Sequence, residues 1–244
     1  MQAWAFLSPK NPVMLFYSTH IENGFVRLEE EESRHLLTVL RRKVGDRLQL
    51  TDGKGWFYEA EIAEAGKRHA LARIVSRHAA PPERSARLHL AIAPTKQMER
   101  FEWFLEKATE IGVDEITPLL CQRSERDRIR TDRLEKILVS AMKQSLRARL
   151  PKLNDPTPFR QMVDRSATAQ SFIAWCSADP LPHLQSLLSP GIDTLIAIGP
   201  EGDFSPEEVK IALAKGFRGV GLGAARLRTE TAGIFAVSVF NLAG

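Results

Sequence analysis

Short apolar segments alternate with amphipathic ones over residues 88–244 of this chain, and this alternation constrains the fold more than any other feature. The segments LHLAIAP, VDEITPLL, SFIAWCS and TLIAIG have the length and composition of buried strands. Apolar residues recur at helical spacing after Met98 and again after Leu134. Within the first of these helices, Trp103 and Phe104 are predicted to lie in the core. Because strands that alternate with helices form a parallel sheet covered on both faces, we predict an α/β domain.

Residues 14–80 have a different pattern, which predicts mostly β structure. The stretch DRLQLTDGKGWFYEAEI alternates apolar and polar residues on both sides of Asp52 and Gly53, as in a hairpin. The stretch HALARIVSR predicts a further strand, and leucines at helical spacing predict one short helix over residues 30–40. We therefore expect a small β-barrel with one helix.

The ends of these segments suggest the domain boundaries and the compartment. A Pro-Pro pair in polar surroundings marks residues 81–87 as a linker, and residues 1–13 are interpreted as an N-terminal extension without the features of a signal peptide. No apolar run approaches the ~20 residues that a membrane span needs. Cys121 and Cys176 have no metal-binding spacing and suit a reducing compartment. We expect a cytoplasmic protein without a metal.

The stretch IGPEGDFSPEE joins a predicted strand to a predicted helix. Ser205 has the features of an N-cap, Pro206 of the first helical residue and Glu208 of the third, and Gly216 marks the end of the helix. Ligands of parallel sheets bind beyond the carboxyl ends of the strands, which is where the loop 199–202 falls. Its glycines permit close approach of a ligand to the main chain. The tetrapeptide alone leaves two interpretations open, an empty connection or a binding loop.

A second glycine-bearing strand end occurs in VGLGAARLRTETAG, residues 220–233. The Gly-Leu-Gly triplet suggests a dinucleotide fingerprint, but Arg226 stands where that motif needs its third glycine, so this interpretation fails. The stretch that follows, AGIFAVSVFNLA, is apolar on nearly all sides. This composition predicts a helix buried in the core or against a partner subunit.

The basic residues concentrate in one segment. Residues 121–152 contain ten Lys or Arg and four Asp or Glu, a net charge of +6, whereas the whole chain has a net charge of +4. Such a run is either a solvated helix face or a track for RNA phosphates. The charge imbalance favours RNA.

The two glycine-bearing stretches together resemble the SPOUT class of RNA methyltransferases. IGPEGDFSPEEV followed by LGAARLRTETA is most similar to the RsmE-type 16S ribosomal RNA uridine-N3 methyltransferases. The stretches RHLLTVLRRKVGDRLQLTDGKG, EKATEIGVDEITPLLCQRS and AMKQSLRARLPKL resemble other parts of the same family, in the same order. The resemblance covers nearly the whole chain from Met14 onward.

The resemblance implies a fold, a cofactor and partners. Members of this family have an N-terminal PUA-like β-barrel that binds RNA, and an α/β domain whose mostly parallel sheet, with helices on both faces, contains a deep trefoil knot. They bind S-adenosylmethionine in the knot, act as homodimers and methylate N3 of a uridine in 16S ribosomal RNA of the small subunit. We expect the same fold, cofactor, reaction and partners here.

The resemblance also implies site residues. The residues expected to line the cofactor are Ile198, Gly199, Pro200, Glu201, Gly202, Leu222, Gly223, Leu227, Thr229 and Thr231. Glu201 and Glu230 are candidate bases for the uracil N3 proton, and Arg228 is the candidate stabiliser of the resulting anion. The resemblance and the basic segment together suggest these RNA-binding residues: His35, Arg41, Arg42, Lys43, Lys96, Arg123, Arg126, Lys143, Gln144 and Arg147.

Two departures from the family pattern stand inside the predicted site. The family usually has a second glycine at the position of Asp203, and an arginine followed by an aliphatic residue at the position of Ala225 and Arg226. Aspartate adopts a left-handed backbone less readily than glycine. These departures motivate one alternative, a non-catalytic RNA-binding or ribosome-assembly module on the same fold. A second alternative, an ordinary nucleotide-cofactor enzyme, is disfavoured by the failed fingerprint.

Overall fold

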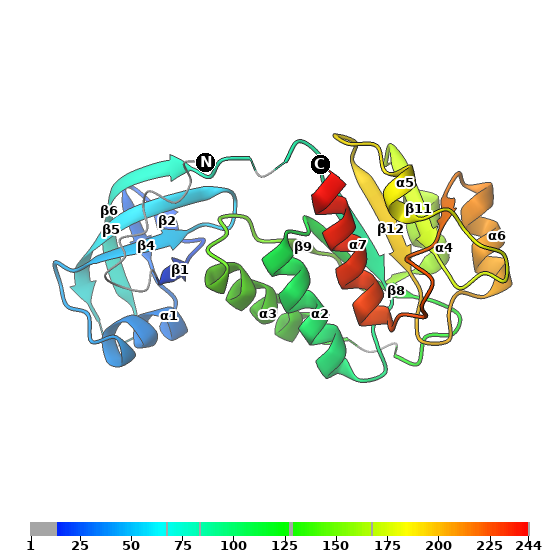
Figure 1. Ribbon diagram of the computed structural model, residues 1–244. Coiled ribbons are helices and arrows are strands. Elements are labelled where there is room, and N and C mark those ends of the chain that lie inside the picture. The colour runs from blue at the N-terminus through cyan, green and yellow to red at the C-terminus, as the bar shows by residue number, and fades with distance from the viewer. Residues whose placement is uncertain (1–13, 67, 83, 127–128, 167, 244) are drawn as a thin grey trace. The chain divides into compact units, whose positions relative to one another are not determined.

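The computed structural model describes residues 14–66, 68–82, 84–126, 129–166 and 168–243 (Figure 1). The expected extension, residues 1–13, lies outside them. The chain divides into two compact units. The first contains the chain up to Pro82 together with Val139–Leu150, and the second contains Glu83–Leu138 and Pro151–Gly244.

The first unit is a six-stranded, mostly antiparallel sheet. Its strands are β1 (Leu15–Tyr17), β2 (Ile21–Glu22), β3 (Phe25–Arg27), β4 (Arg47–Thr51), β5 (Trp56–Ala65) and β6 (Ala70–Ala79). Their order is β1-β4-β5-β6-β3-β2, and only β1 and β4 pair in parallel. The predicted hairpin is confirmed, since β4 and β5 pair on either side of Asp52. The Asp52 carboxylate accepts the N–H of Lys54 at 2.7 Å, and Gly53 has a φ of 72° that favours glycine.

One face of this sheet is closed by the predicted short helix. The helix consists of α1 (Glu30–Arg34) and a π-helical turn, η1 (His35–Val39), so the prediction for residues 30–40 is correct apart from the π geometry of its second half. Ser33 fastens it to the sheet, because its Oγ donates to the Leu28 carbonyl and accepts the N–H of Ala70. Leu36 and alternate residues of β4, β5 and β6 form the buried core.

The second unit contains a seven-stranded sheet. Its strands are β7 (Leu88–Ile92), β8 (Glu115–Leu120), β9 (Lys152–Leu153), β10 (Thr157–Pro158), β11 (Gln170–Ala174), β12 (Thr194–Ile198) and β13 (Arg218–Val220). The order is β10-β8-β7-β12-β11-β13, with β9 on β8, and every pair is parallel. The predicted α/β fold is therefore confirmed. Strand β12 lies between β7 and β11, which both precede it in the chain. The trefoil knot itself stays a prediction.

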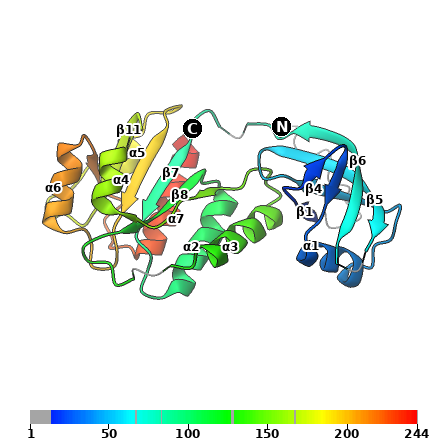
Figure 2. The same ribbon diagram turned by 180° about the vertical axis from the view of Figure 1, so that it is seen from behind.

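Helices cover both faces of this sheet (Figures 1 and 2). The helices of the unit are α2 (Met98–Ile111), α3 (Thr131–Gln144), α4 (Phe159–Arg165), α5 (Leu184–Leu187), α6 (Pro206–Ala214) and α7 (Thr229–Ala243); α3 ends in the first unit. Helices α2 and α7 pack together, and a Cβ on Gly233 of α7 would lie 2.7 Å from both Ile92 and Phe104. Glycine therefore permits the close contact of α7 with β7 and α2.

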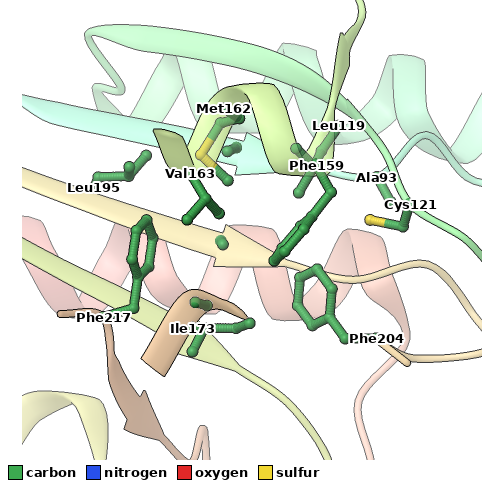
Figure 3. Packing of buried hydrophobic residues seen from close by; sticks show 13 residues of the cluster. Ala93, Leu119, Cys121, Phe159, Met162, Val163, Ile173, Leu195, Phe204 and Phe217 are labelled. Atoms are coloured by element: carbon green, nitrogen blue, oxygen red, sulfur yellow. The ribbon is translucent and has the colours of Figure 1, made fainter. Parts of the chain in front are cut away.

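The opposite face packs against α4 and α6. Figure 3 shows this cluster, in which Phe159 of α4 and Phe204 lie with ring centroids 5.3 Å apart. Ile173 and Leu195 contribute from the strands, and Cys121 is buried at the edge. Phe204 lies two residues beyond the predicted binding loop 199–202, so burial of its ring fixes the chain just after that loop.

Two predictions about α2 have different outcomes. Phe104 is buried, as predicted, but the prediction that Trp103 lies in the core is wrong, because its residue surface is 46% exposed. The buried stripe of α2 is formed by Phe101, Phe104, Leu105, Ala108 and Thr109, and position 103 falls on the other side of this stripe. Among the helices described, none is both long and apolar enough to cross a membrane.

Candidate functional site

Three loops of the second unit line an open cavity of about 1030 Å³ at the carboxyl ends of β11, β12 and β13. This is where a parallel sheet binds its ligands. The lining residues are Arg100, Ala174–Leu181, His183, Ile198–Glu201, Asp203, Val220–Thr229 and Ala232. The two predicted stretches thus contribute to one cavity, although they are separated by some twenty residues in the sequence.

The loop after β12 is fixed in place by the start of α6, the helix that follows it. The predicted capping box of α6 is present, since Ser205 Oγ accepts the N–H of Glu208 and the Glu208 carboxylate accepts the N–H of Ser205. The second oxygen of Glu208 accepts the N–H of Gln122 at 2.8 Å. Gly199 lies against Phe204, whose ring would be 3.1 Å from a Cβ at that position. Only glycine fits there without displacement of the ring.

The loop after β13 presents a row of main-chain donors. In the described part of the chain, none of the N–H groups of residues 222–227 donates to a protein acceptor. Main-chain N–H groups require a hydrogen-bond partner, so these six are available to a ligand or to water. Gly223 has a φ of 120° and open space around the position of a Cβ. The loop ends at Thr229, whose hydroxyl donates to the Gly199 carbonyl at 3.1 Å.

The loop after β11 completes the cavity and was not assigned to the site from the sequence. Trp175 to Leu181 line the cavity, and so does His183, whose Nδ1 accepts the N–H of Gln185. Cys176 donates its main-chain N–H to the Asp203 carboxylate at 2.8 Å. A signal was present in the sequence, because SFIAWCS is a strand whose carboxyl end falls at the same edge of the sheet.

The predicted cofactor residues divide into two sets. Ile198, Gly199, Pro200, Glu201, Leu222, Gly223, Leu227 and Thr229 line the cavity. Gly202 and Thr231 are not among the lining residues in the described structure. A Cβ on Gly202 would face Arg123 at 3.3 Å, which shows that this glycine faces the other side of its loop.

The three predicted catalytic residues have different surroundings. Arg228 is exposed and lines the cavity. Glu201 also lines it, and its Oε1 accepts the main-chain N–H of Lys96 at 2.9 Å. Glu230 is 7% exposed and does not line the cavity; its Oε1 lies 3.9 Å from Nε of Arg100, which does.

Three of the predicted RNA-binding residues lie in this unit. Arg123 donates through Nη1 to the Gly202 carbonyl at 2.9 Å. Arg126 donates to the Lys96 carbonyl, and the Lys96 ammonium pairs with Glu125 at 2.8 Å. All three side chains are exposed, so their charges remain at the surface, while Arg123 and Arg126 also donate hydrogen bonds to the main chain.

The other predicted RNA-binding residues belong to the first unit. Arg41, Arg42, Lys43 and Gln144 are exposed, and His35 and Arg147 are half-buried. Lys143 forms an ion pair with Glu32 in which both side chains are largely covered. The Lys143 charge is therefore already compensated within the unit, unlike the charges of the exposed arginines.

The cysteines have no catalytic character. Burial, and then the charge of Glu208, raises the pKa of the Cys121 thiol far above its ordinary value. Burial, and then the charge of Asp203, also raises the pKa of Cys176. Both thiols are protonated at neutral pH, which disfavours a thiolate nucleophile. Among the described residues, no group of His, Cys, Asp and Glu side chains has an arrangement for a metal.

Comparison with known proteins relates this architecture to one family. A family model described as an RNA methyltransferase domain matches residues 82–241, and one described as an RNA methyltransferase PUA domain matches residues 28–75. The ribosomal RNA small subunit methyltransferase E of Synechocystis is 30% identical over 222 residues, which are 88% of this chain and 72% of that protein.

Solved structures agree with this relation over nearly the whole chain. A protein of Porphyromonas gingivalis that is provisionally named an rRNA methyltransferase is 43% identical, with a TM-score of 0.89 over 94% of this chain and 98% of that one. The ribosomal RNA small subunit methyltransferase E of Neisseria gonorrhoeae, solved with S-adenosylmethionine bound, is 27% identical. Its TM-score is 0.80 over 93% of this chain and 95% of that one.

Proposed function

This chain belongs to the family of RNA methyltransferases with a PUA domain, and from that premise we propose that it is an S-adenosylmethionine-dependent methyltransferase of 16S ribosomal RNA. The finer assignment, N3 of a uridine as the methylated atom, belongs to the same proposal. It is supported by the resemblance of the two glycine-bearing stretches to the uridine-N3 methyltransferases.

The observation that carries the proposal is the run of unpaired main-chain donors beside the cavity. Residues 222–227 offer six N–H groups without a protein acceptor in the described structure, next to the apolar side chains of Ile198, Leu222 and Leu227. An adenosyl group requires both hydrogen-bonding main chain and an apolar surface for its ring. These residues therefore fit S-adenosylmethionine, which supplies a methyl group already activated by a sulfonium.

The residues of the chain must then position the target and accept its proton. Methyl transfer requires the attacking nitrogen to be aligned with the methyl group, which is largely a matter of proximity. The exposed guanidinium of Arg228 at the cavity offers donors for the negative charge that develops on uracil oxygens. Arg226 is also exposed there, with Nη2 3.5 Å from the Glu201 carbonyl.

Glu201 is the better placed of the two candidate bases. It lines the cavity, and donation from Lys96 N–H to Oε1 orients its carboxylate and leaves Oε2 for the proton. Glu230 is set back from the cavity beside Arg100. We therefore propose that Glu230 holds Arg100 in place and that Glu201 is the base.

The RNA partner is proposed to bind through basic side chains of both units. The exposed cations Arg41, Arg42 and Lys43 in the first unit, and Arg123 and Arg126 in the second, support contacts with phosphates. Because such contacts release counterions, affinity for RNA should fall steeply as the salt concentration rises.

A homodimer is the proposed assembly. Helix α7 is apolar on nearly all sides, and its Leu242 is 85% exposed. Trp103, on the neighbouring helix α2, is 46% exposed. Single exposed apolar side chains are common on monomers, so the proposal rests chiefly on the resemblance to a homodimeric family. Sedimentation equilibrium of the purified protein tests the assembly, and a monomer at micromolar concentration would contradict it.

The decisive experiment is nucleoside mass spectrometry of 16S ribosomal RNA from cells that lack this protein. We expect 3-methyluridine to disappear, to return with the parent gene and to remain absent with an Arg228→Ala variant that accumulates to the parent level. If 3-methyluridine persists without the protein, a non-catalytic role in ribosome assembly becomes the better interpretation. Calorimetry with S-adenosylmethionine and the purified protein separates the same alternatives, because an assembly module has no need of the cofactor.

A further inference from the structure

The backbone of Asp203 adopts a conformation that glycine would adopt more easily. Its φ is 62°, in the left-handed region, and its N–H donates to the Pro200 carbonyl at 2.9 Å to close the turn. Non-glycine residues pay a strain energy in this region, although aspartate is among the more tolerant. The side chain must therefore contribute something that offsets the strain.

The carboxylate of Asp203 makes two hydrogen bonds of different kinds. Oδ1 accepts the N–H of the next residue, Phe204, at 2.8 Å, which is a local contact. Oδ2 accepts the N–H of Cys176, also at 2.8 Å, and Cys176 belongs to the loop after β11. Both bonds have a charged acceptor, which makes them stronger than bonds between neutral groups.

The bond to Cys176 connects two walls of the cavity. The ladder between β11 and β12 ends with Ala174 opposite Ile198. Beyond that rung, Asp203 links residues 199–205 to residues 175–183 in the described structure, through the main-chain N–H of Cys176 and through the Cys176 thiol. The two ends of the 175–183 segment have other contacts, since Trp175 packs against the core cluster and the Pro182 carbonyl accepts the N–H of Gly221. Residues 176–180 between them are exposed, so the contact from Asp203 falls on the least restrained part of the loop.

We propose that Asp203 is a positioning residue for the cofactor site, whose carboxylate holds the loop after β11 against the loop after β12 before S-adenosylmethionine binds. This role rests on the proposed function. A glycine at this position would form the same turn without strain but would leave the exposed residues 176–180 to be ordered on binding. A loop that is already ordered binds its ligand more tightly, because less conformational entropy is lost when the ligand binds.

Two substitutions distinguish the effect of the Asp203–Cys176 hydrogen bond from the effect of the left-handed backbone at position 203. Asp203→Gly relieves the left-handed backbone and removes both hydrogen bonds, whereas Asp203→Asn keeps one acceptor oxygen for either N–H. Asn23 provides a matched control, because it is also left-handed, with a φ of 51°, and lies in the first unit. Asn23→Gly makes the same backbone change without any contact to the cavity.

The first measurement does not depend on activity. Hydrogen exchange of the protein without S-adenosylmethionine, read by mass spectrometry of the peptide that contains Cys176, should be fastest in Asp203→Gly, intermediate in Asp203→Asn and equal to the parent in Asn23→Gly. Unchanged exchange at Cys176 in Asp203→Gly would overturn the proposal, since the hydrogen bond from Cys176 to Asp203 would then have no effect on the loop.

The second measurement is the affinity for S-adenosylmethionine by calorimetry. We expect Asp203→Gly to raise Kd roughly tenfold or more, the order expected when several residues must be ordered on binding, with Asp203→Asn between it and the parent. In the methylation assay, KM for S-adenosylmethionine should rise more than kcat falls. If Asp203→Gly binds as tightly as a parent that does bind, only the role of Asp203 is overturned. If the parent itself does not bind S-adenosylmethionine, the proposed function fails with it.

Discussion

Replacement of Thr229 by valine is the sharpest test of how the cavity is held together. The Thr229 side chain is buried, with 6% of the residue exposed, and its Oγ1 donates to the Gly199 carbonyl at 3.1 Å. This bond joins the first residue of α7 to the loop after β12. Valine has the same branched shape, so the substitution mainly replaces the hydroxyl with a methyl group.

The expected magnitude follows from the burial of both groups. A hydrogen bond between neutral groups contributes about 0.5–1.5 kcal/mol, and a buried acceptor left without a partner adds up to about 1–3 kcal/mol. Gly199 is buried but borders the cavity, where water can replace the hydroxyl, so we expect a loss of about 1–2 kcal/mol in the free energy of unfolding. For a protein of this size that corresponds to a fall in Tm of about 2–8 °C.

The same bond should contribute to cofactor affinity. If the loop at Gly199 relaxes in the variant and must return to its place on binding, the lost free energy appears in Kd, and ~1.4 kcal/mol corresponds to a tenfold change. Calorimetry with S-adenosylmethionine and differential scanning calorimetry measure both quantities. Thr229→Ser keeps the hydroxyl and serves as control. A Thr229→Val variant equal to the parent in both measurements, or a Thr229→Ser variant as impaired as Thr229→Val, would refute this reasoning.

The remaining predictions concern the packing, pH dependence and ion pairing of the second unit. Gly233→Ala places a methyl group 2.7 Å from Ile92, and because repacking costs about 1–3 kcal/mol, Tm should fall in a thermal melt even though alanine favours helices. Burial lowers the pKa of His89, so the folded protein keeps it neutral; the stability advantage of the parent over His89→Gln in urea unfolding should shrink as pH falls through the ordinary pKa of 6.5. Arg84→Ala removes the ion-pair partner of the Asp114 carboxylate, which keeps only the N–H of Leu88, and should lower the free energy of unfolding by about 2–4 kcal/mol in the same assay.

The fold and two of the three cavity loops could be predicted from the sequence because local rules determine them. The capping box of Ser205 and Glu208 places the start of α6 to the residue, and an apolar strand before Gly199 places the loop at the edge of the sheet. Parallel strands share the edge at which they end, so two glycine-bearing strand ends predict a common cavity. Which residues of these stretches line that cavity does not follow from local rules, because Gly202 and Glu230 were predicted to belong to the site and do not line it.

Other features depend on tertiary contacts that leave no local pattern. The loop at Cys176 carries no glycine motif, and it is hydrogen-bonded to Asp203, some thirty residues away in the chain. Trp103 was assigned to the core by residue type, but the direction of the buried stripe of α2 is set by its packing against α7. Arg84 falls in a stretch that composition marks as a linker, yet its side chain is 8% exposed and donates to Asn241 at the end of α7.

The cavity is therefore formed by the parallel sheet and by hydrogen bonds between the loops that follow its strands. The parallel sheet brings the ends of β11, β12 and β13 to one edge, but a ladder fixes only residues within strands and leaves the loops beyond it free to separate. Asp203 joins the first loop to the second through Cys176, and Thr229 joins the second to the start of α7 through Gly199. Each bond uses one side chain and one main-chain group, so the remaining main chain stays available to a ligand. A site that binds its cofactor mainly through main-chain atoms depends on the hydrogen bonds that fix its loops. The positions of those main-chain atoms are set by the loops and not by the side chains that line the cavity.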